Sequence, residues 1–411
     1  MIVVIGGGAA GLMAAIRAAM CGADVTLIEK NNDLGKKLRI TGKGRCNVTN
    51  ACATEDIFSN IPTNHNFLYS AIYSFTNYDV MSFFEDAGVP LKEERGQRVF
   101  PQSDKAMDIV NALKEKVREL GVRLVRGRAS EIIIQNGEVK GVRTENATIF
   151  GESVILATGG KSYPQTGSDG SGYVMAQKIG HSITSIKPAL VPVETVESTQ
   201  SLMGLSLKNI GITVVDKNGK KKFTDFGEML FTHFGMTGPV ILSSSSHMGE
   251  NPAGMRVEID LKPALDEQTL DKRILRDFEK YQNRNFENAL SDLLPTKMIG
   301  YVVERSGIDK YKKVNSITKE ERRRLLECLK HLSFTVKSYR PVSEAIVTSG
   351  GINVKEINSS TMESKIVSGL YFAGEVIDVD AYTGGFNLQI AFSTGYLAGE
   401  KAAEKELSKN D

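Results

Sequence analysis

The first thirty residues pass from an apolar run to a glycine-rich turn and then to an alanine-rich segment, a pattern that predicts strand, turn and helix. Residues 2–5 are short, apolar and rich in Ile and Val, as in a strand buried in a parallel sheet. Gly6, Gly8 and Gly11 follow, and an alanine-rich helix is expected to about residue 20. Residues 24–29 then predict a second strand. This order is that of a βαβ nucleotide-binding unit.

The spacing of the three glycines suits a turn that receives a pyrophosphate. Gly6 would let the chain leave the strand sharply, Gly8 would let the backbone approach the ligand, and Gly11 would let the helix pack close to the strand. Unpaired N–H groups at the helix start favour an anion there. Glu29 ends the second strand, where such folds bind a ribose, and its charge disfavours a 2′-phosphate. The alternative is an Ala/Gly-rich buried helix without a ligand.

Periodicity divides the next part of the chain into further helices and strands. Helices are expected over 64–88, 104–120 and 173–179. Strands are expected over 122–125, 129–135 and 139–144 as an antiparallel excursion, with Asn136-Gly137 as a two-residue turn. A buried strand then ends in Ala-Thr-Gly-Gly160, where small residues would let the backbone lie against a flat ligand. Residues 167–172 are interpreted as a helix start capped by Asp169, with a second phosphate cradle as the alternative.

From about residue 191 the pattern changes to short β-type runs, which predict a small barrel or sandwich. These runs cover 191–196, 211–216, 222–226, 239–243 and 255–261. Helical spacing follows, and Thr318 with Glu321 forms a capping-box sequence. Residues 297–330 hold ten Lys or Arg against five Asp or Glu, which we interpret as a solvated helix face rather than a docking site for an acidic partner.

The last part of the chain returns to nucleotide-type chemistry. A strand ending in Gly374-Glu375 places a carboxylate where it can bind ribitol hydroxyls. Gly384-Gly385 then opens a helix to about Gly399, whose positive N-terminus would stabilise the negative charge of a reduced flavin near N1 and O2. Because both chain ends carry cofactor chemistry, they are expected to build one site.

The predicted fold class is therefore α/β, a two-part Rossmann-like FAD-binding domain with an inserted β-barrel and a small helical domain. We expect the FAD-binding parts at 1–190 and 351–411, the barrel at 191–265 with 333–350 returning, and the helical insert at 266–332.

Composition excludes several other classes of protein. With 41% hydrophobic and 24% charged residues, the 411-residue chain is an ordinary globular one. A net charge of +2 does not indicate a nucleic-acid partner, and the four cysteines form no CxxC pair, so no metal is expected. Residues 1–16 lack the basic start of a signal peptide, and no apolar run is long enough to span a membrane. A cytoplasmic location is expected.

Six motifs together resemble the BaiN-type, aminoacetone-oxidase-like family of FAD flavoproteins, over nearly the whole chain. They are the glycine turn with Glu29, Thr41-Gly-Lys-Gly-Arg-Cys-Asn47, Ala157-Thr-Gly-Gly160, Thr232-His-Phe-Gly-Met-Thr-Gly-Pro239, Thr361-Met-Glu-Ser-Lys365 and Gly384-Gly-Phe-Asn-Leu-Gln389. The resemblance implies FAD in a two-part Rossmann-like domain and cofactor contacts by Gly8, Gly11, Glu29, Ala157, Gly374, Glu375 and Asn387.

The motifs and the resemblance together define a predicted cofactor set. It comprises Gly6, Gly8, Ala10, Gly11, Glu29, Lys30, Lys37, Gly42, Gly44, Arg45, Cys46, Asn47, Ala129, Ala157, Thr158, Gly159, Gly374, Glu375, Gly385, Phe386, Asn387 and Leu388. The glycine-rich loop at 31–50 is expected to run along the cofactor; a solvated basic loop is its alternative. Candidate catalytic residues are His233, Arg45 and Tyr382, although His233 in a turn and Cys46 are also typical of structural residues.

The expected activity is that of an FAD-dependent oxidoreductase that transfers hydride through flavin N5. We expect an NAD(P)H-dependent reductase of a small, enone-like substrate, with NAD(P)H as a transient donor because no second glycine motif is visible. Two alternatives remain open: an amine oxidase of the aminoacetone type that produces hydrogen peroxide, and a non-catalytic flavin-binding interaction protein. The expected partner is a small molecule, with neither nucleic acid nor membrane.

Overall fold

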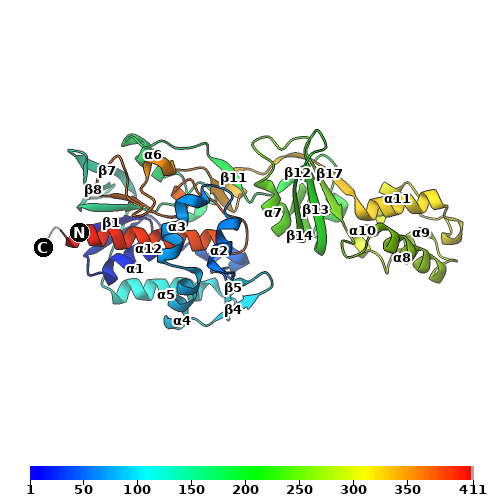
Figure 1. Cartoon of the computed structure of the whole chain (residues 1–411), viewed down its shortest axis with the longest axis horizontal. Helices are drawn as coiled ribbons and strands as arrows, with labels where there is room; N and C mark the ends of the chain where they lie inside the picture. Colours follow the sequence, from blue (N-terminus) through cyan, green and yellow to red (C-terminus); the bar gives the residue numbers. More distant parts are fainter. Residues whose placement is uncertain (409–411) are drawn as a thin grey trace. The chain divides into compact units, whose positions relative to one another are not determined.

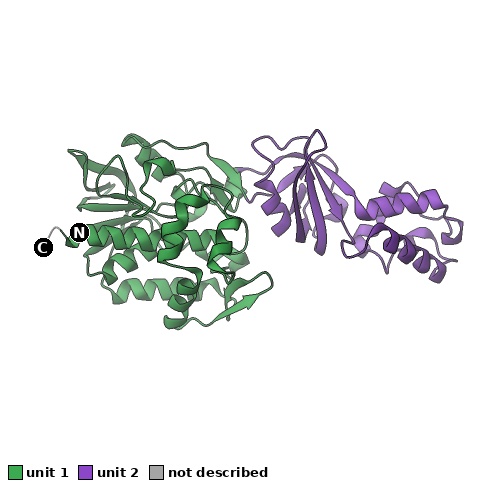
Figure 2. Ribbon diagram, viewed as in Figure 1, with its two compact units in different colours: residues 1–189, 342–411 green, residues 190–341 purple. Residues whose placement is uncertain are grey.

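The computed structural model describes residues 1–408 and divides the chain into two compact units (Figure 2). Unit 1 contains residues 1–189 and the chain from residue 342 onward, and unit 2 contains residues 190–341. The chain therefore returns to unit 1 earlier than the predicted residue 351. The reason is that β18 (Val347–Ser349) leaves the barrel and pairs antiparallel with β11 (Lys187–Ala189), directly before unit 2 begins.

Unit 1 is built on a five-stranded parallel sheet with the order β19-β10-β1-β2-β6. The bounds are β1 (Ile2–Ile5), β2 (Val25–Glu29), β6 (Arg123–Arg126), β10 (Ser153–Leu156) and β19 (Leu370–Phe372). All residues of β1 and β10 are buried, as expected for central strands covered on both faces. The strand predicted at 122–125 was expected in the antiparallel excursion. It instead forms β6, which pairs in parallel with β2 and is the edge strand of the main sheet.

Helices α1 (Ala9–Met20) and α12 (Phe386–Leu407) lie side by side along this sheet (Figure 1). Gly395 and Gly399 of α12 face the backbone of Ala10 and Ala14, where an added Cβ would lie 2.3 Å from a carbonyl oxygen in each case. Only glycine permits this close approach of the two helices. The last helix of the chain is thus packed against the first, and both chain ends belong to one core.

The remaining elements of unit 1 surround this core. Helices are α2 (Thr54–Ile57), α3 (Tyr69–Ser74), α4 (Asn77–Asp86), α5 (Ala106–Glu119) and α6 (Ser171–Lys178). Small antiparallel sheets consist of β3 (Thr49–Asn50), β4 (Leu91–Glu94) and β5 (Arg98–Pro101), and of β7 (Ala129–Gln135), β8 (Glu138–Thr144) and β9 (Thr148–Phe150). The single helix predicted over 64–88 is interrupted at Thr76, which starts α4 with a capping box to Asp79.

Unit 2 contains a closed six-stranded barrel with the order β12-β15-β14-β13-β16-β17. Its strands are β12 (Val193–Thr195), β13 (Ser206–Val215), β14 (Lys221–Phe231), β15 (Gly235–Thr237), β16 (Arg256–Asp260) and β17 (Leu332–Tyr339). Its helices are α7 (Pro239–Ser245), α8 (Glu267–Lys280), α9 (Phe286–Ala289), α10 (Thr296–Ser306) and α11 (Lys319–Lys330).

The predicted strand over 239–243 is wrong, because these residues form α7. Gly238 precedes it with φ +101°, and Pro239 occupies the first helical turn, where its missing N–H group has no consequence. The hydroxyls of Ser244 and Ser245 donate hydrogen bonds to the carbonyl oxygens of Ile241 and Leu242, at 2.8 and 2.7 Å. A short apolar run therefore became a helix through its local capping rather than through its composition.

No helix within residues 1–408 combines the length and the apolar content that a membrane span requires. The same part of the chain contains no group of three or more His, Cys, Asp or Glu side chains placed to hold a metal ion.

Candidate functional site

The carboxyl ends of four adjacent parallel strands meet at one edge of the main sheet. Strand β2 ends there in Glu29, Gly6 and Ala157 directly follow β1 and β10, and Gly374 comes two residues after β19. The register aligns Ile5 with Ile28 and with Leu156, and Leu156 with Phe372, so the four strand ends are level with one another. This edge is where open parallel sheets bind their ligands.

The three motif glycines have different surroundings. Gly6 has φ +108°, and a Cβ there would lie 2.5 Å from the oxygen of Ala157; a Cβ on Gly11 would lie 1.8 Å from the oxygen of Gly6. Both are therefore glycines for packing reasons. Gly8 has no atom within 4 Å of an added Cβ, and it precedes α1 without any side-chain cap. The uncapped N–H groups at the start of α1 thus face open space, as a diphosphate site requires.

Glu29 stabilises the glycine turn directly. Its Oε2 accepts a hydrogen bond from the backbone N–H of Gly7 at 2.7 Å, and its Oε1 accepts two from Asn31 at 2.7 and 2.8 Å. A carboxylate can accept about four hydrogen bonds, so one acceptor position remains for a ribose hydroxyl. Ala129 begins β7 close to this strand end, where the N–H of Gly127 donates to the oxygen of Glu29 at 3.0 Å.

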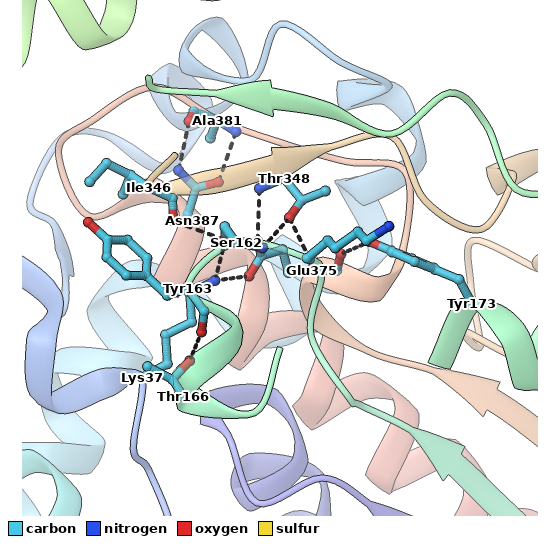
Figure 3. A network of polar contacts seen from close by, with 11 residues as sticks. Lys37, Ser162, Tyr163, Thr166, Tyr173, Ile346, Thr348, Glu375, Ala381 and Asn387 are labelled. Atoms are coloured by element: carbon cyan, nitrogen blue, oxygen red, sulfur yellow. Dashed lines mark hydrogen bonds and ion pairs between the residues drawn. The ribbon is translucent and has the colours of Figure 1, made fainter. Parts of the chain in front are cut away.

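Glu375 is the centre of a polar network that joins four separate segments (Figure 3). Its Oε2 accepts from Nζ of Lys37 at 2.6 Å, while Oε1 accepts from Oγ of Ser162 at 2.9 Å and from the N–H of Thr348 at 2.8 Å. Lys37 also donates to Ser162 at 2.7 Å. Lys37 and Glu375 were each predicted as cofactor residues, and the structure brings them together.

Ser162 and Thr348 were missed by the sequence reasoning. The Thr348 hydroxyl accepts from the N–H groups of Lys161 and Ser162 at 2.7 and 3.1 Å, which ties β18 to the segment after β10. Ser162 could have been found, because it follows the glycine end of the predicted strand. Thr348 had no local signal, since only the pairing of β18 with β11 places it there.

The start of α12, like that of α1, has no side-chain cap. Its N-cap, Gly385, has φ +101°, and a Cβ there would lie 2.3 Å from the oxygen of Thr49. The Asn387 amide bonds the preceding loop instead: Nδ2 donates to the oxygen of Ala381 at 2.7 Å, and Oδ1 accepts from its N–H at 3.0 Å. The Asn387 side chain thus holds the loop before α12, and its contact with the cofactor stays a prediction. Phe386 is buried, and Leu388 packs partly against the core.

In the loop after residue 37, Arg45 and Cys46 both have defined protein surroundings. Arg45 forms ion pairs with Glu94 and Asp104, and its guanidinium lies 4.2 Å from the centre of the Phe100 ring. Cys46 is fully buried, and this burial raises the pKa of its thiol to about 12. Cys46 is thus a packed side chain, in agreement with its structural alternative, and the Arg45 guanidinium is engaged by two carboxylates, while its catalytic role stays a prediction.

Two buried polar atoms of this site have no partner among the described residues: Asn47 Oδ1 and Thr158 Oγ1. Both belong to the predicted cofactor set, and buried polar atoms are normally hydrogen-bonded. Gly42 and Gly44 have φ +56° and +85° in the same loop as Asn47, and Gly159 has φ +73° next to Thr158. The unpaired atoms are consistent with a polar ligand lying along these two segments.

Lys30 lies beside the start of α6, with Nζ 2.8 Å from Oδ2 of Asp169. The N-cap of α6 is Gly170, and the Asp169 carboxylate accepts from the N–H of Ser171 at 3.1 Å. Burial would raise the pKa of Asp169, but hydrogen bonds from Lys30 and Ser171 hold this pKa well below its ordinary value. A carboxylate at this helix start favours the capping interpretation over a second phosphate cradle.

The three catalytic candidates are distributed over the two units, with Arg45 and Tyr382 in unit 1 and His233 in unit 2. His233 is exposed in unit 2, between β14 and β15, with its ring edge-on to Phe234 at 5.0 Å. Tyr382 is half-buried in unit 1, where its N–H donates to the oxygen of Asn60 at 2.9 Å. Burial and then the charge of Asp380 raise the pKa of the Tyr382 hydroxyl, which keeps it protonated at neutral pH.

The residues at this edge fit an FAD. The starts of α1 and α12, which carry no side-chain cap, supply N–H groups for anions, Gly8 faces open space, and Asn47 and Thr158 offer unpaired polar atoms. The diphosphate would be held at Gly8 and Gly11, the adenosine ribose at Glu29, and the ribitol at the network of Lys37 and Glu375.

Comparison with known proteins also indicates a Rossmann-type domain, over most of the chain. A model of the HI0933-like protein Rossmann domain matches residues 1–401. The 3-dehydro-bile acid delta(4,6)-reductase of Clostridium scindens is 30% identical over 407 residues, 98% of each chain. The ribosomal RNA dihydrouridine synthase of Haemophilus influenzae is 33% identical over 398 residues, 96% of each chain.

Among solved structures, the fold is similar to that of the 3-ketosteroid delta1-dehydrogenase from Sterolibacterium denitrificans, with a TM-score of 0.53 and 13% identity over 98% of this chain and 99% of that one. At this identity the likeness concerns the fold alone. The family match and the two full-length relatives go further: the chain belongs to the HI0933-like Rossmann-domain family and is an FAD-dependent oxidoreductase.

Proposed function

We propose that this protein is an NAD(P)H-dependent reductase of a carbon–carbon double bond conjugated to a carbonyl group. The observation that carries the proposal is the pair of relatives that match almost the whole chain, a 3-dehydro-bile acid delta(4,6)-reductase and a ribosomal RNA dihydrouridine synthase. In chemical terms, each named activity adds hydrogen across a ring double bond conjugated with a carbonyl group. We therefore propose for this chain the type of reaction that the two relatives share, rather than the substrate of either one.

The protein's own groups would serve this reaction by binding and orientation. When bound, FAD supplies the two-electron chemistry. Lys37 and Glu375 would hold the ribitol through a network that is already complete, so little ordering is required on binding. The N–H groups at the start of α12 and the positive end of its dipole favour negative charge in front of Gly385.

The nicotinamide donor is expected to bind transiently. The sequence contains one glycine motif of the dinucleotide type, at Gly6 to Gly11, and that motif leads into the site assigned to FAD. A donor that binds, reacts and leaves needs no second motif of this kind. The proposal therefore includes NADH or NADPH as a co-substrate rather than as a resident cofactor.

A small enone is the first candidate substrate, and a uridine of ribosomal RNA is the second. The RNA candidate is favoured by two relatives, since the Escherichia coli ribosomal RNA dihydrouridine synthase is also 29% identical over 404 residues. It departs from the expectation that no nucleic acid is involved. The basic helix face gives this candidate little support, because Lys312, Arg322 and Lys330 are paired with Glu321, Asp271 and Asp260.

An anaerobic assay of the purified holoprotein tests the proposal. NADH and NADPH would be supplied in turn with androst-4-ene-3,17-dione, with cyclohex-2-enone, and with a transcript of ribosomal RNA. The expected result is donor oxidation that depends on one of these compounds, together with a product heavier by two hydrogen atoms in mass spectrometry. Saturated androstane-3,17-dione serves as the matched control, because it lacks only the conjugated double bond.

Aerobic incubation with aminoacetone distinguishes the amine-oxidase alternative. Hydrogen peroxide formed from the amine, without reduction of any conjugated compound, would contradict the proposed reductase. A flavin that reacts with neither donor nor any substrate of the panel would favour the non-catalytic alternative instead.

A further inference from the structure

Tyr163 has a backbone conformation that bulky residues rarely adopt. Its φ and ψ are +49° and +60°, in the left-handed region, and it directly precedes Pro164. A side chain with a Cβ is disfavoured in this region, and a following proline restricts the residue further. Such strain persists only where the surrounding structure enforces it, and it is concentrated at functional sites.

The turn around Tyr163 is held on both sides. Its carbonyl oxygen accepts two hydrogen bonds from Thr166, one from N–H and one from Oγ1, both at 2.8 Å. On the other side, Ser162 is tied to Glu375 and to Lys37, the ion pair assigned to the ribitol. These contacts determine the direction in which the Tyr163 side chain points.

The two neighbouring side chains leave this segment in different directions (Figure 3). Ser162 points into the network around Glu375, whereas the ring of Tyr163 points away from it, with its hydroxyl on the far side. Tyr163 therefore contributes nothing to holding Glu375. Its position in the chain nonetheless keeps it next to the residues at the carboxyl edge of the sheet.

The Tyr163 hydroxyl has no hydrogen-bond partner within residues 1–408, although its ring is half-buried. Two other tyrosine hydroxyls do have partners: that of Tyr339 donates toward the oxygens of Ser245 and Gly249 at 2.9 and 2.8 Å, and that of Tyr281 donates to Asp292 at 2.7 Å. A tyrosine hydroxyl in partly apolar surroundings usually finds a partner. Burial, and then the charge of Glu344, raise the pKa of Tyr163, so it remains a hydrogen-bond donor at neutral pH.

We propose that the Tyr163 hydroxyl donates a hydrogen bond to the carbonyl oxygen of the conjugated substrate and is thus a catalytic residue. This inference rests on the proposed reductase function. When hydride derived from NAD(P)H adds to the β-carbon of the double bond, the π electrons move onto the carbonyl oxygen, and a solvent proton then completes the α-carbon. A donor aimed at that oxygen stabilises the charge that develops in the transition state.

The test compares Tyr163→Phe with Tyr78→Phe, a matched control that removes the hydroxyl of an exposed tyrosine in the same unit. The substrate is the panel compound that the wild-type protein reduces fastest. FAD content is expected to be unchanged in both variants, while kcat falls about a hundredfold in Tyr163→Phe alone.

A second readout does not depend on turnover. The same substrate, labelled with carbon-13 at its conjugated carbonyl, is bound to the oxidised holoprotein, and its carbonyl stretching frequency is measured by difference infrared spectroscopy. The wild-type protein and Tyr78→Phe should lower this frequency relative to water-free solvent, and Tyr163→Phe should not. A purely structural role of the ring would leave the frequency unchanged between variants.

The outcomes separate the two proposals. Equal kcat in both variants, or a frequency shift that survives in Tyr163→Phe, overturns the role of Tyr163 and leaves the reductase function standing. If the wild-type protein reduces no conjugated compound of the panel, the reductase function and the role of Tyr163 both fall.

Discussion

Helices α1 and α12 of unit 1 begin differently from helices α8 and α11 of unit 2. In unit 1, α1 and α12 begin after Gly8 and Gly385, and neither glycine offers a side chain to the first N–H groups. In unit 2, α8 and α11 begin after Asp266 and Thr318, whose side chains accept from Thr269 at 2.7 Å and from Glu321 at 3.2 Å. Helices α8 and α11 therefore satisfy one of their first N–H groups with a side chain, whereas α1 and α12 leave theirs available to a ligand.

At the starts of α1 and α12, the first N–H groups are available to a ligand, and the stabilising effect of a side-chain cap is absent. A side-chain cap stabilises a helix by about 1 kcal/mol, and unit 1 forgoes that contribution at the two helices that face the cofactor edge. A bound anion replaces the cap, because it accepts from the same N–H groups.

The largest effect is expected from Gly11→Ala in α1, compared with Gly300→Ala in α10. A Cβ on Gly11 would lie 1.8 Å from the backbone oxygen of Gly6, whereas a Cβ on Gly300 meets no atom within 4 Å. Gly11→Ala should reduce the free energy of unfolding by about 3 kcal/mol or more, while Gly300→Ala should raise it by up to about 1 kcal/mol. Urea titrations followed by circular dichroism measure both values. Similar values for the two variants would contradict the close packing at Gly11.

Next in size is the loss of FAD in Gly8→Val. The open space at Gly8 admits the new side chain without a clash in the protein, so the fold should persist while the pyrophosphate is excluded. We expect FAD affinity to fall by about a hundredfold or more, measured by the flavin-to-protein absorbance ratio after gel filtration. An unchanged far-ultraviolet spectrum is the control for folding. Full FAD occupancy would contradict the assignment of the diphosphate to this turn.

Thr318→Ala should have a smaller effect, which changes the stability of unit 2 but not the binding of FAD. It removes both the side-chain bond to the N–H of Glu321 and the capping box at the start of α11. The free energy of unfolding of unit 2 should decrease by about 1 kcal/mol, with FAD content unchanged. Hydrogen exchange of the α11 amides is the measurement. A loss of FAD in this variant would show that helix capping in unit 2 supports the cofactor edge, against the comparison drawn above.

The smallest effect concerns pH and Asp169 at the start of α6. Since Lys30 and Ser171 hold its pKa below that of an unfolded aspartate, about 4, the carboxylate stabilises the fold above that pH. This contribution is lost as the pH falls through the lower, folded pKa. The melting temperature of Asp169→Asn should therefore be below that of the wild type at pH 7 and approach it at acid pH. A difference independent of pH would contradict the ionic origin of the contact.

Several features of the molecule were determined by the sequence over short distances. The turn from Gly6 to Gly11, the strand ending in Glu29 and the capping box at Thr318 each depend on residues within a few positions of one another. Their geometry follows from glycine freedom, helix caps and strand alternation, which are local physical effects. The family resemblance rested on the same short motifs, and the family match confirms it.

Other features depend on contacts between distant parts of the chain. Arg45 resembled a free catalytic cation in the sequence, but Glu94 and Asp104 from a separate sheet and turn engage it. No local pattern indicates which charges will meet in space.

The polar network at the cofactor edge shows this limit most clearly. Local sequence supplied Lys37 and Glu375 as separate candidates, yet their ion pair exists only because β2 and β19 end at the same edge of one sheet. Thr348 joins them only because β18 pairs with β11, and Tyr163 is strained only because Thr166 and Ser162 hold the turn. The sequence determined the motifs typical of dinucleotide binding, because each of them is local; tertiary structure decided which side chains lie around them, because these side chains come from positions hundreds of residues apart.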